Sequence, residues 1–178
     1  MKSFRIAFCG LVSALALVMM LITGLVPVGT YALPLFAGAL LIAVVIEFGV
    51  GYALAAYAAV SILSLFLSGD KEAVVYFIAF FGYYPIIKSL IERLRSKAAA
   101  WVIKFAVFTA AIVAAFFVCK FVLAIPDEEF TVFGFYLPWA FLIVGEIFFP
   151  IYDRCISVLV AAYVMKIRGR LFKSAPRG

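Results

Sequence analysis

The stretch IAFCGLVSALALVMMLITGLV, residues 6–26, decides the fold class of this chain. It carries no charged residue, and only small residues interrupt its apolar run. A helix needs about 20 apolar residues, at about 1.5 Å each, to cross the roughly 30 Å hydrocarbon core of a bilayer. The stretch is too long for the apolar region of a secretory signal peptide, and it lacks a convincing small-residue cleavage site. We therefore expect a membrane-spanning helix at about residues 5–24.

The composition of the whole chain also indicates that its helices lie in lipid. Of its 178 residues, 69% are hydrophobic and 13% are charged, whereas soluble domains have about 45 to 50% apolar and about 25% charged residues. A soluble domain needs a polar outer face on each element, and long stretches here show none. The basic residues behind the net charge of +6 form short clusters beside apolar segments, a pattern that favours membrane topology over nucleic-acid binding. We expect a lipid bilayer as partner and no nucleic acid.

The same length rule predicts an all-α integral membrane protein, a six-helix transmembrane bundle that forms one domain over residues 1–178. Pro27, Gly29 and Pro34 predict a loop after the first helix. Pro138 and Pro150 interrupt the last apolar stretch, so we expect a short re-entrant or interfacial segment before one long, bent final helix. The expected helices lie at about residues 5–24, 35–50, 52–67, 73–91, 98–125 and 139–167.

The charge distribution predicts the orientation of these helices. Six crossings place Lys2, Arg5, the basic segment 93–97 and the basic C-terminal tail on one side, and the acidic segment 127–129 on the other. Because basic residues accumulate on the cytoplasmic side, we expect a multi-pass protein of the cell (plasma) membrane with both termini in the cytoplasm. Seven crossings would place the basic tail outside.

Ionisable residues within the apolar segments are candidate functional residues, because they are costly in a membrane. Glu146 and Asp153, seven residues apart, share a helical face. Arg154 has two candidate partners, Asp153 and Glu47, and a structural ion pair is as acceptable here as a ligand contact.

The lysines nearer the helix ends have simpler interpretations. Lys88 and Glu92 have the i, i+4 spacing of a surface ion pair. Lys104 and Lys120 lie near the ends of their apolar segment, where their long side chains can extend to the interfaces.

The segment Phe80-Phe81-Gly82-Tyr83-Tyr84-Pro85 predicts a break in the fourth helix, because proline removes a backbone hydrogen bond. Near the membrane centre, the two phenols could line a cavity that suits a ring-shaped organic ligand. A place in the interfacial aromatic belt is the alternative.

No catalytic or metal-binding motif is present. The chain has no histidine, and its three cysteines lie in apolar runs without CxxC spacing, which is typical of small buried hydrophobic residues. It also lacks HExxH, GxSxG and Walker A motifs. We expect neither an enzyme nor a cofactor or metal, and an ATP-driven process would need another chain.

Two further features have open interpretations. Ala7, Gly10 and Ala14 form a small-residue stripe on the first helix, which permits close helix packing either within the protein or with a partner subunit. The loop around Thr30 and Tyr31 is uncharged and bounded by turn-forming residues, so it is either a lid or a simple connector.

The string Pro27-x-Gly29-Thr30-x-x-x-Pro34-x-x-Ala37-Gly38-x-Leu40-Leu41, followed by Gly51-Tyr52-Ala53, resembles the substrate-binding S components of energy-coupling factor (ECF) transporters. The resemblance covers about the first 70 residues. It implies a six-helix protein that captures a vitamin or similar small organic molecule from outside. It also implies partners in trans, a transmembrane coupling subunit bound to two ATPases. The nickel and cobalt branch relies on an N-terminal histidine, which is lacking here, so an organic substrate is expected.

The resemblance also assigns roles to residues. An AxxxA motif in the first helix docks the coupling subunit, and its match here is Ala7, Gly10 and Ala14, with glycine in an alanine position. The loop with Pro27, Gly29 and Thr30 would gate the site. Ligand contacts come from the later helices, and Tyr31 of the loop is a further candidate. The candidates on the later helices are Tyr83, Tyr84, Trp139, Glu146 and Asp153.

Two other functions fit the sequence less closely. A structural protein that scaffolds an envelope assembly would have its interior filled by side chains, and a ligand screen would find nothing. A membrane enzyme acting on lipid would need more acid and base groups than this chain offers in one place.

Overall fold

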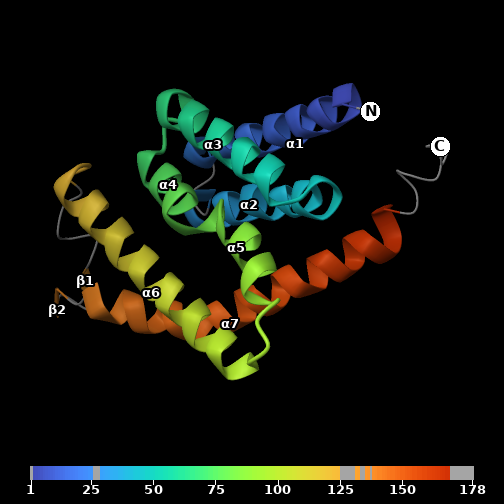
Figure 1. The fold of residues 1–178 in the computed structure, drawn as a ribbon. Helices are drawn as coiled ribbons and strands as arrows, with labels where there is room; N and C mark the ends of the chain where they lie inside the picture. Colours follow the sequence, from blue (N-terminus) through green and yellow to red (C-terminus); the bar gives the residue numbers. More distant parts are fainter. Residues whose placement is uncertain (1, 26–28, 125–130, 133–134, 137, 169–178) are drawn as a thin grey trace.

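The computed structural model describes residues 2–25, 29–124, 131–132, 135–136 and 138–168 (Figure 1). Most of these residues are helical. Two antiparallel strands of two residues each, β1 (Thr131–Val132) and β2 (Phe135–Tyr136), precede the last helix. The α-helices are α1 (Lys2–Ile22), α2 (Gly29–Phe48), α3 (Val50–Leu67), α4 (Lys71–Tyr76), α5 (Tyr84–Ile91), α6 (Lys97–Phe121) and α7 (Pro138–Ala162). Short helices of other types continue three of them: the 3-10 turn η1 (Thr23–Leu25) and the π-helices η2 (Phe77–Phe81) and η4 (Tyr163–Ile167).

Six helical stretches of the described chain are long and apolar enough to cross a membrane, when α4, η2 and α5 are taken as one. The expected number of helices is therefore confirmed. The stretches are Lys2–Leu25, Gly29–Phe48, Val50–Leu67, Lys71–Ile91, Lys97–Phe121 and Leu142–Lys166.

The helices form two groups that share the broken fourth stretch (Figure 1). One hydrophobic cluster joins α1, α2, α3, α4, η2 and α5 around residues such as Met20, Leu41 and Phe77. The other joins α2, η2, α5, α6 and α7 and is rich in aromatic rings, among them Phe80 and Phe149. Because α2 and the fourth stretch belong to both clusters, they connect the two halves of the bundle.

The connection between α1 and α2 is shorter than the sequence indicates. Helix α2 begins at Gly29, and Pro34 is buried inside it, so the expectation of a loop as far as Pro34 is wrong. Pro34 lacks only the N–H that would bond to the carbonyl of Thr30, close to the helix start, so it costs one hydrogen bond there. Of the expected gating loop, Gly29 and Thr30 are helical, and Pro27 lies outside the described residues.

The fourth stretch is interrupted just before Pro85, as expected. The N–H of Gly82 donates to the carbonyl of Phe77, and Pro85 offers no N–H to the carbonyl of Phe81. That carbonyl faces α2, because a Cβ atom added to Gly38 would lie 2.0 Å from the Phe81 oxygen. Glycine at position 38 therefore allows α2 to approach the break directly.

The final helix is continuous from Pro138 to Ala162, with Pro150 inside it. The long final helix is therefore confirmed. The hairpin β1–β2 is what the structure describes of the segment for which we expected a re-entrant or interfacial path.

The three cysteines are free, but they are not alike. Cys119 is buried and Cys9 is half-buried, whereas Cys155 is exposed on α7. For Cys155 the expectation of a buried residue is wrong, because it lies on the outward face of the helix.

A candidate ligand cavity

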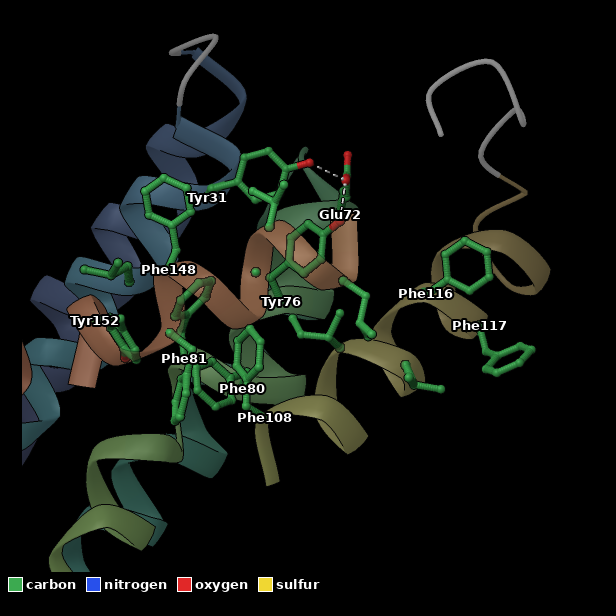
Figure 2. A pocket seen from close by; sticks show the side chains of 17 residues that line it. Tyr31, Glu72, Tyr76, Phe80, Phe81, Phe108, Phe116, Phe117, Phe148 and Tyr152 are labelled. Atoms are coloured by element: carbon green, nitrogen blue, oxygen red, sulfur yellow. Dashed lines mark hydrogen bonds between the residues drawn. The ribbon is translucent and has the colours of Figure 1, made fainter. Parts of the chain in front are cut away.

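A cavity of about 640 Å³ lies between α2, the α4–η2 stretch, α6 and α7 (Figure 2). This volume falls within the range of roughly 300 to 1,000 Å³ that is typical of small-molecule sites. Most of its wall is aromatic or aliphatic. The lining residues are Tyr31, Leu35, Glu72, Tyr76, Phe80, Phe81, Phe108, Ile112, Val113, Phe116, Phe117, Leu142, Val144, Gly145, Phe148, Phe149 and Tyr152.

The polar residues of this wall are Glu72 and three tyrosines, two of which bond to the carboxylate. The hydroxyls of Tyr76 and Tyr31 both donate to Oε1 of Glu72, at 2.8 and 3.2 Å (Figure 2). The two rings lie beside each other, with centroids 5.1 Å apart, and Tyr31 is 54% exposed. Among the described lining residues, Glu72 is the only one with a charged side chain.

The start of α4 explains why Glu72 lies beside Tyr31. Asp70 caps α4 by accepting a hydrogen bond from the N–H of Ala73 at 2.9 Å, as N-terminal aspartates commonly do. Its other oxygen accepts from the Thr30 hydroxyl at 2.8 Å. Asp70 therefore joins the first turn of α2 to the first turn of α4.

Lys71 does not neutralise Glu72, although the two are neighbours in sequence. Its Nζ donates to the carbonyls of Leu65 and Ser68, at 2.7 and 2.8 Å, at the end of α3. The lysine thus satisfies carbonyls that a helix end leaves without partners.

Aromatic rings surround the apolar part of the cavity. Phe108 of α6 and Phe149 of α7 stack with centroids 4.7 Å apart, and Phe80 meets Phe108 edge to face at 5.1 Å. The Tyr152 hydroxyl is buried, and no described group forms a hydrogen bond with it. Rings from three helices thus build one wall.

The candidate ligand residues from the sequence lie in several places, and among those whose side chains the structure describes, Tyr31 alone lines this cavity. Tyr83 faces a second, shallower hollow, which Tyr57 also lines. Trp139 belongs to the first turn of α7, and its side chain lies outside the described part of the chain. Glu146 accepts a hydrogen bond from the hydroxyl of Thr109 on α6.

Asp153 and Tyr84 belong to a buried charge cluster between α5, α6 and α7. One oxygen of Asp153 accepts from the Tyr84 hydroxyl and from Nζ of Lys88, both at 2.5 Å. Lys104 Nζ lies 2.9 Å from the same oxygen and 3.1 Å from Glu92. Lys88 also contacts Glu92, at 2.9 Å. Two lysines are thus balanced by two carboxylates.

This cluster corrects two expectations in part. The expected ion pair between Lys88 and Glu92 is present at 2.9 Å, and Glu92 is half exposed, but Lys88 is 3% exposed, so its placement at the surface is wrong. Lys104 is 5% exposed and turns inward rather than extending to an interface. Both lysines turn inward because Asp153 of α7 lies between them. The spacing of residues within α5 or α6 cannot predict this contact with another helix. Burial raises the pKa of Glu92, but hydrogen bonds from Lys88 and Lys104 outweigh it and hold this pKa below its ordinary value.

Both expected pairings of Arg154 are wrong. Arg154 is exposed, and among the described residues none forms an ion pair with it. The carboxylate of Asp153 is turned to the lysines, and Glu47 pairs instead with Arg168, whose Nε lies 3.1 Å from it. One residue along a helix rotates the side chain by about 100°, which separates Arg154 from its neighbour Asp153.

The small-residue stripe lies on the outer surface of α1. Ala7, Gly10 and Ala14 are all exposed, and a Cβ atom added to Gly10 would meet nothing within 4 Å. The interpretation that the stripe packs against another helix within the described part of the protein is therefore wrong. Its contact with a partner subunit stays a prediction.

No family model, curated protein or solved structure matches. The ECF resemblance therefore stays a prediction from the first 70 residues.

Nothing in the sequence marks Glu72 as a site residue, because it lies in the polar connection Ser68-Gly69-Asp70-Lys71-Glu72, where a solvated carboxylate is ordinary. Glu72 becomes part of the cavity wall because α2 packs beside α4, which brings the Tyr31 hydroxyl to 3.2 Å from Glu72 Oε1.

Proposed function

We propose that this chain is a membrane-embedded subunit that binds a small organic molecule for import. The observation that carries the proposal is the cavity of about 640 Å³ between α2, α4–η2, α6 and α7. Its aromatic wall and few polar groups are typical of small-molecule sites. It lies within a described chain that has six helices long and apolar enough for a membrane, four of which line it.

The proposed orientation places the polar end of the cavity on the outside. With both termini in the cytoplasm, the first turns of α2 and α4 lie at the outer face, and they carry Tyr31 and Glu72. A ligand would then enter from the outside, and Tyr31, which is 54% exposed, would meet it early.

Energy for import would come from partner chains. The sequence has no Walker A motif, so we assign ATP hydrolysis to ATPase subunits in trans that act through a transmembrane coupling subunit, as in ECF-type transporters. The exposed stripe of Ala7, Gly10 and Ala14 supports α1 as the docking helix, since small residues allow close approach of another helix.

A structural scaffold of the cell envelope is the alternative. The buried charge cluster favours it, because Asp153 ties α5, α6 and α7 together in the manner of a rigid core. A scaffold has no need of an open cavity, however, and here the described side chains leave the space unfilled.

A thermal-shift screen separates the two functions. The full chain, purified in detergent, is heated with vitamins, amino acids and nucleobases in turn. A ligand present at 100 times its dissociation constant stabilises the folded state by about 2.7 kcal/mol, so the binding proposal predicts a clear rise in Tm with at least one compound class. A protein that unfolds cooperatively and responds to none of them would favour the scaffold.

A further inference from the structure

We propose that the ligand of this cavity is an organic cation, an amine carried on a ring-shaped apolar body. The inference rests on the proposed function, because it names the chemical class that the same cavity would take. Three observations carry it: an uncompensated carboxylate, aromatic faces beside it, and a wall without a described basic group.

The carboxylate is Glu72. Both tyrosine hydroxyls donate to its Oε1, and no described group donates to Oε2. No described lysine or arginine forms a salt bridge with Glu72, and Lys71 is held by the carbonyls at the end of α3. Glu72 therefore presents a negative charge to the cavity that hydrogen bonds from phenols only partly balance.

The contrast with the buried charge cluster makes this feature informative. There, two carboxylates meet two lysines at 2.5 to 3.1 Å, so the charges are balanced within the protein. At Glu72 the protein supplies hydrogen-bond donors but no described cation. Glu72 is half-buried, and a ligand in the cavity would remove its remaining water. A charge taken out of water is costly unless it is paired, so a cationic ligand group would complete this site.

The rings near Glu72 suit the same ligand. Tyr31 and Tyr76 lie beside the carboxylate with centroids 5.1 Å apart, and Phe80, Phe81 and Phe148 continue the wall (Figure 2). Aromatic faces attract cations, and the attraction grows when water is excluded. The same rings pack against an apolar ring. A carboxylic acid would instead meet Glu72 with like charge.

Matched probe compounds test the charge preference directly. We would titrate the purified full chain with tryptamine, tryptophol and indole-3-acetate, which share one ring and differ in carrying an ammonium, a hydroxyl or a carboxylate. The corresponding phenethyl series repeats the test with a smaller ring. The readout is the ligand concentration that gives half of the maximal rise in Tm.

The proposal predicts that the amine binds about tenfold or more tightly than the alcohol, and that the acid binds most weakly. The variant Glu72→Gln keeps the shape and should abolish the preference of amine over alcohol. The matched control Glu47→Gln removes a carboxylate that does not line the cavity and should leave the preference unchanged, whatever its effect on Tm.

The outcomes separate the two proposals. Equal or tighter binding of the alcohol or the acid, or an amine preference that survives Glu72→Gln, overturns the cation inference while ligand binding stands. If none of the probes binds and the wider screen is also flat, both proposals fall. If the wider screen yields only neutral or anionic ligands, the cation inference alone falls.

Discussion

At the scale of single residues, Asp153 determines how the second half of the bundle is held together. Its carboxylate accepts from Tyr84 and contacts Lys88 and Lys104, so side chains from α5 and α6 converge on one group of α7. A buried ion pair adds little compared with an apolar pair, but the loss of one partner leaves the other charged and alone. Asp153 should therefore be sensitive to substitution.

We expect Asp153→Asn to lower the free energy of unfolding by about 3 kcal/mol or more, because Glu92 alone must then balance two buried lysines. Arg154→Gln is the matched control, since Arg154 is the next residue and is exposed without a described ion pair. Thermal unfolding in detergent measures both. Equal Tm values for the two variants would show that the cluster does not stabilise the fold.

Glu92 gives the cluster a predictable pH dependence. Its pKa is lower in the folded protein than its ordinary value of about 4.5, so the unfolded chain binds the proton more readily. The contribution of Glu92 to stability is then fully present above the ordinary pKa and is lost as the pH falls through the folded one. The Tm difference between the wild type and Glu92→Gln should therefore be larger at pH 7 than at about pH 3. A Tm difference between the two proteins that grows as the pH falls would contradict the predicted direction.

At the scale of helices, the contact between α2 and the break in the fourth stretch is the tightest that the glycines reveal. A Cβ atom at position 38 would lie 2.0 Å from the Phe81 carbonyl oxygen, which is backbone and cannot rotate away. Gly38→Ala must then separate α2 from η2. We expect a loss of stability of about 1 to 3 kcal/mol, the usual cost of overpacking.

Gly10→Ala provides the matched control, because nothing lies within 4 Å of the added Cβ and alanine favours a helix. Thermal unfolding should show a lower Tm for Gly38→Ala and an unchanged or higher Tm for Gly10→Ala. A Gly38→Ala protein as stable as the wild type would mean that α2 and η2 do not approach so closely.

The prolines show what the sequence can and cannot reveal about helices. Pro85 follows glycine and two tyrosines, and the expected break is present there. Pro34 was expected to end a loop, yet it lies in the second turn of α2, where one missing hydrogen bond near the helix start is tolerated. The lengths of the apolar stretches predicted the number of helices. The residues at which each helix begins and ends also depend on its packing against other helices, which its own sequence does not show.

At the scale of the whole molecule, the membrane orientation can be tested with single cysteines. In a chain whose Cys9, Cys119 and Cys155 are replaced by serine, we expect a cysteine at exposed Gly69 to react with a membrane-impermeant maleimide in intact cells. A cysteine at exposed Ala98, the second residue of α6, should react only after permeabilisation. The reverse labelling pattern would overturn the proposed topology.

The candidate site could be foreseen only in part. Tyr31 was expected at the ligand because of its position between the first two helices. Its partner Glu72 is 41 positions away in sequence, and the two meet because Thr30 and Asp70 join α2 to α4. Tyr84 and Asp153 were expected to face a ligand, but they face each other and two lysines. Residue types can be read from the sequence, whereas their assembly into one cavity depends on the tertiary fold.

The claim that this cavity binds a small organic molecule is tested most directly by measuring ligand binding after a bulky side chain fills the cavity. Val113 of α6 lines the cavity, and Val102 of the same helix is 69% exposed outside it. We would measure binding of the compounds that stabilise the wild type to Val113→Trp and to the control Val102→Trp, with cooperative unfolding confirmed for each. Our account predicts that Val102→Trp binds as the wild type does and that Val113→Trp loses binding. Equal binding by both variants, or a folded wild type that binds no compound, would contradict it.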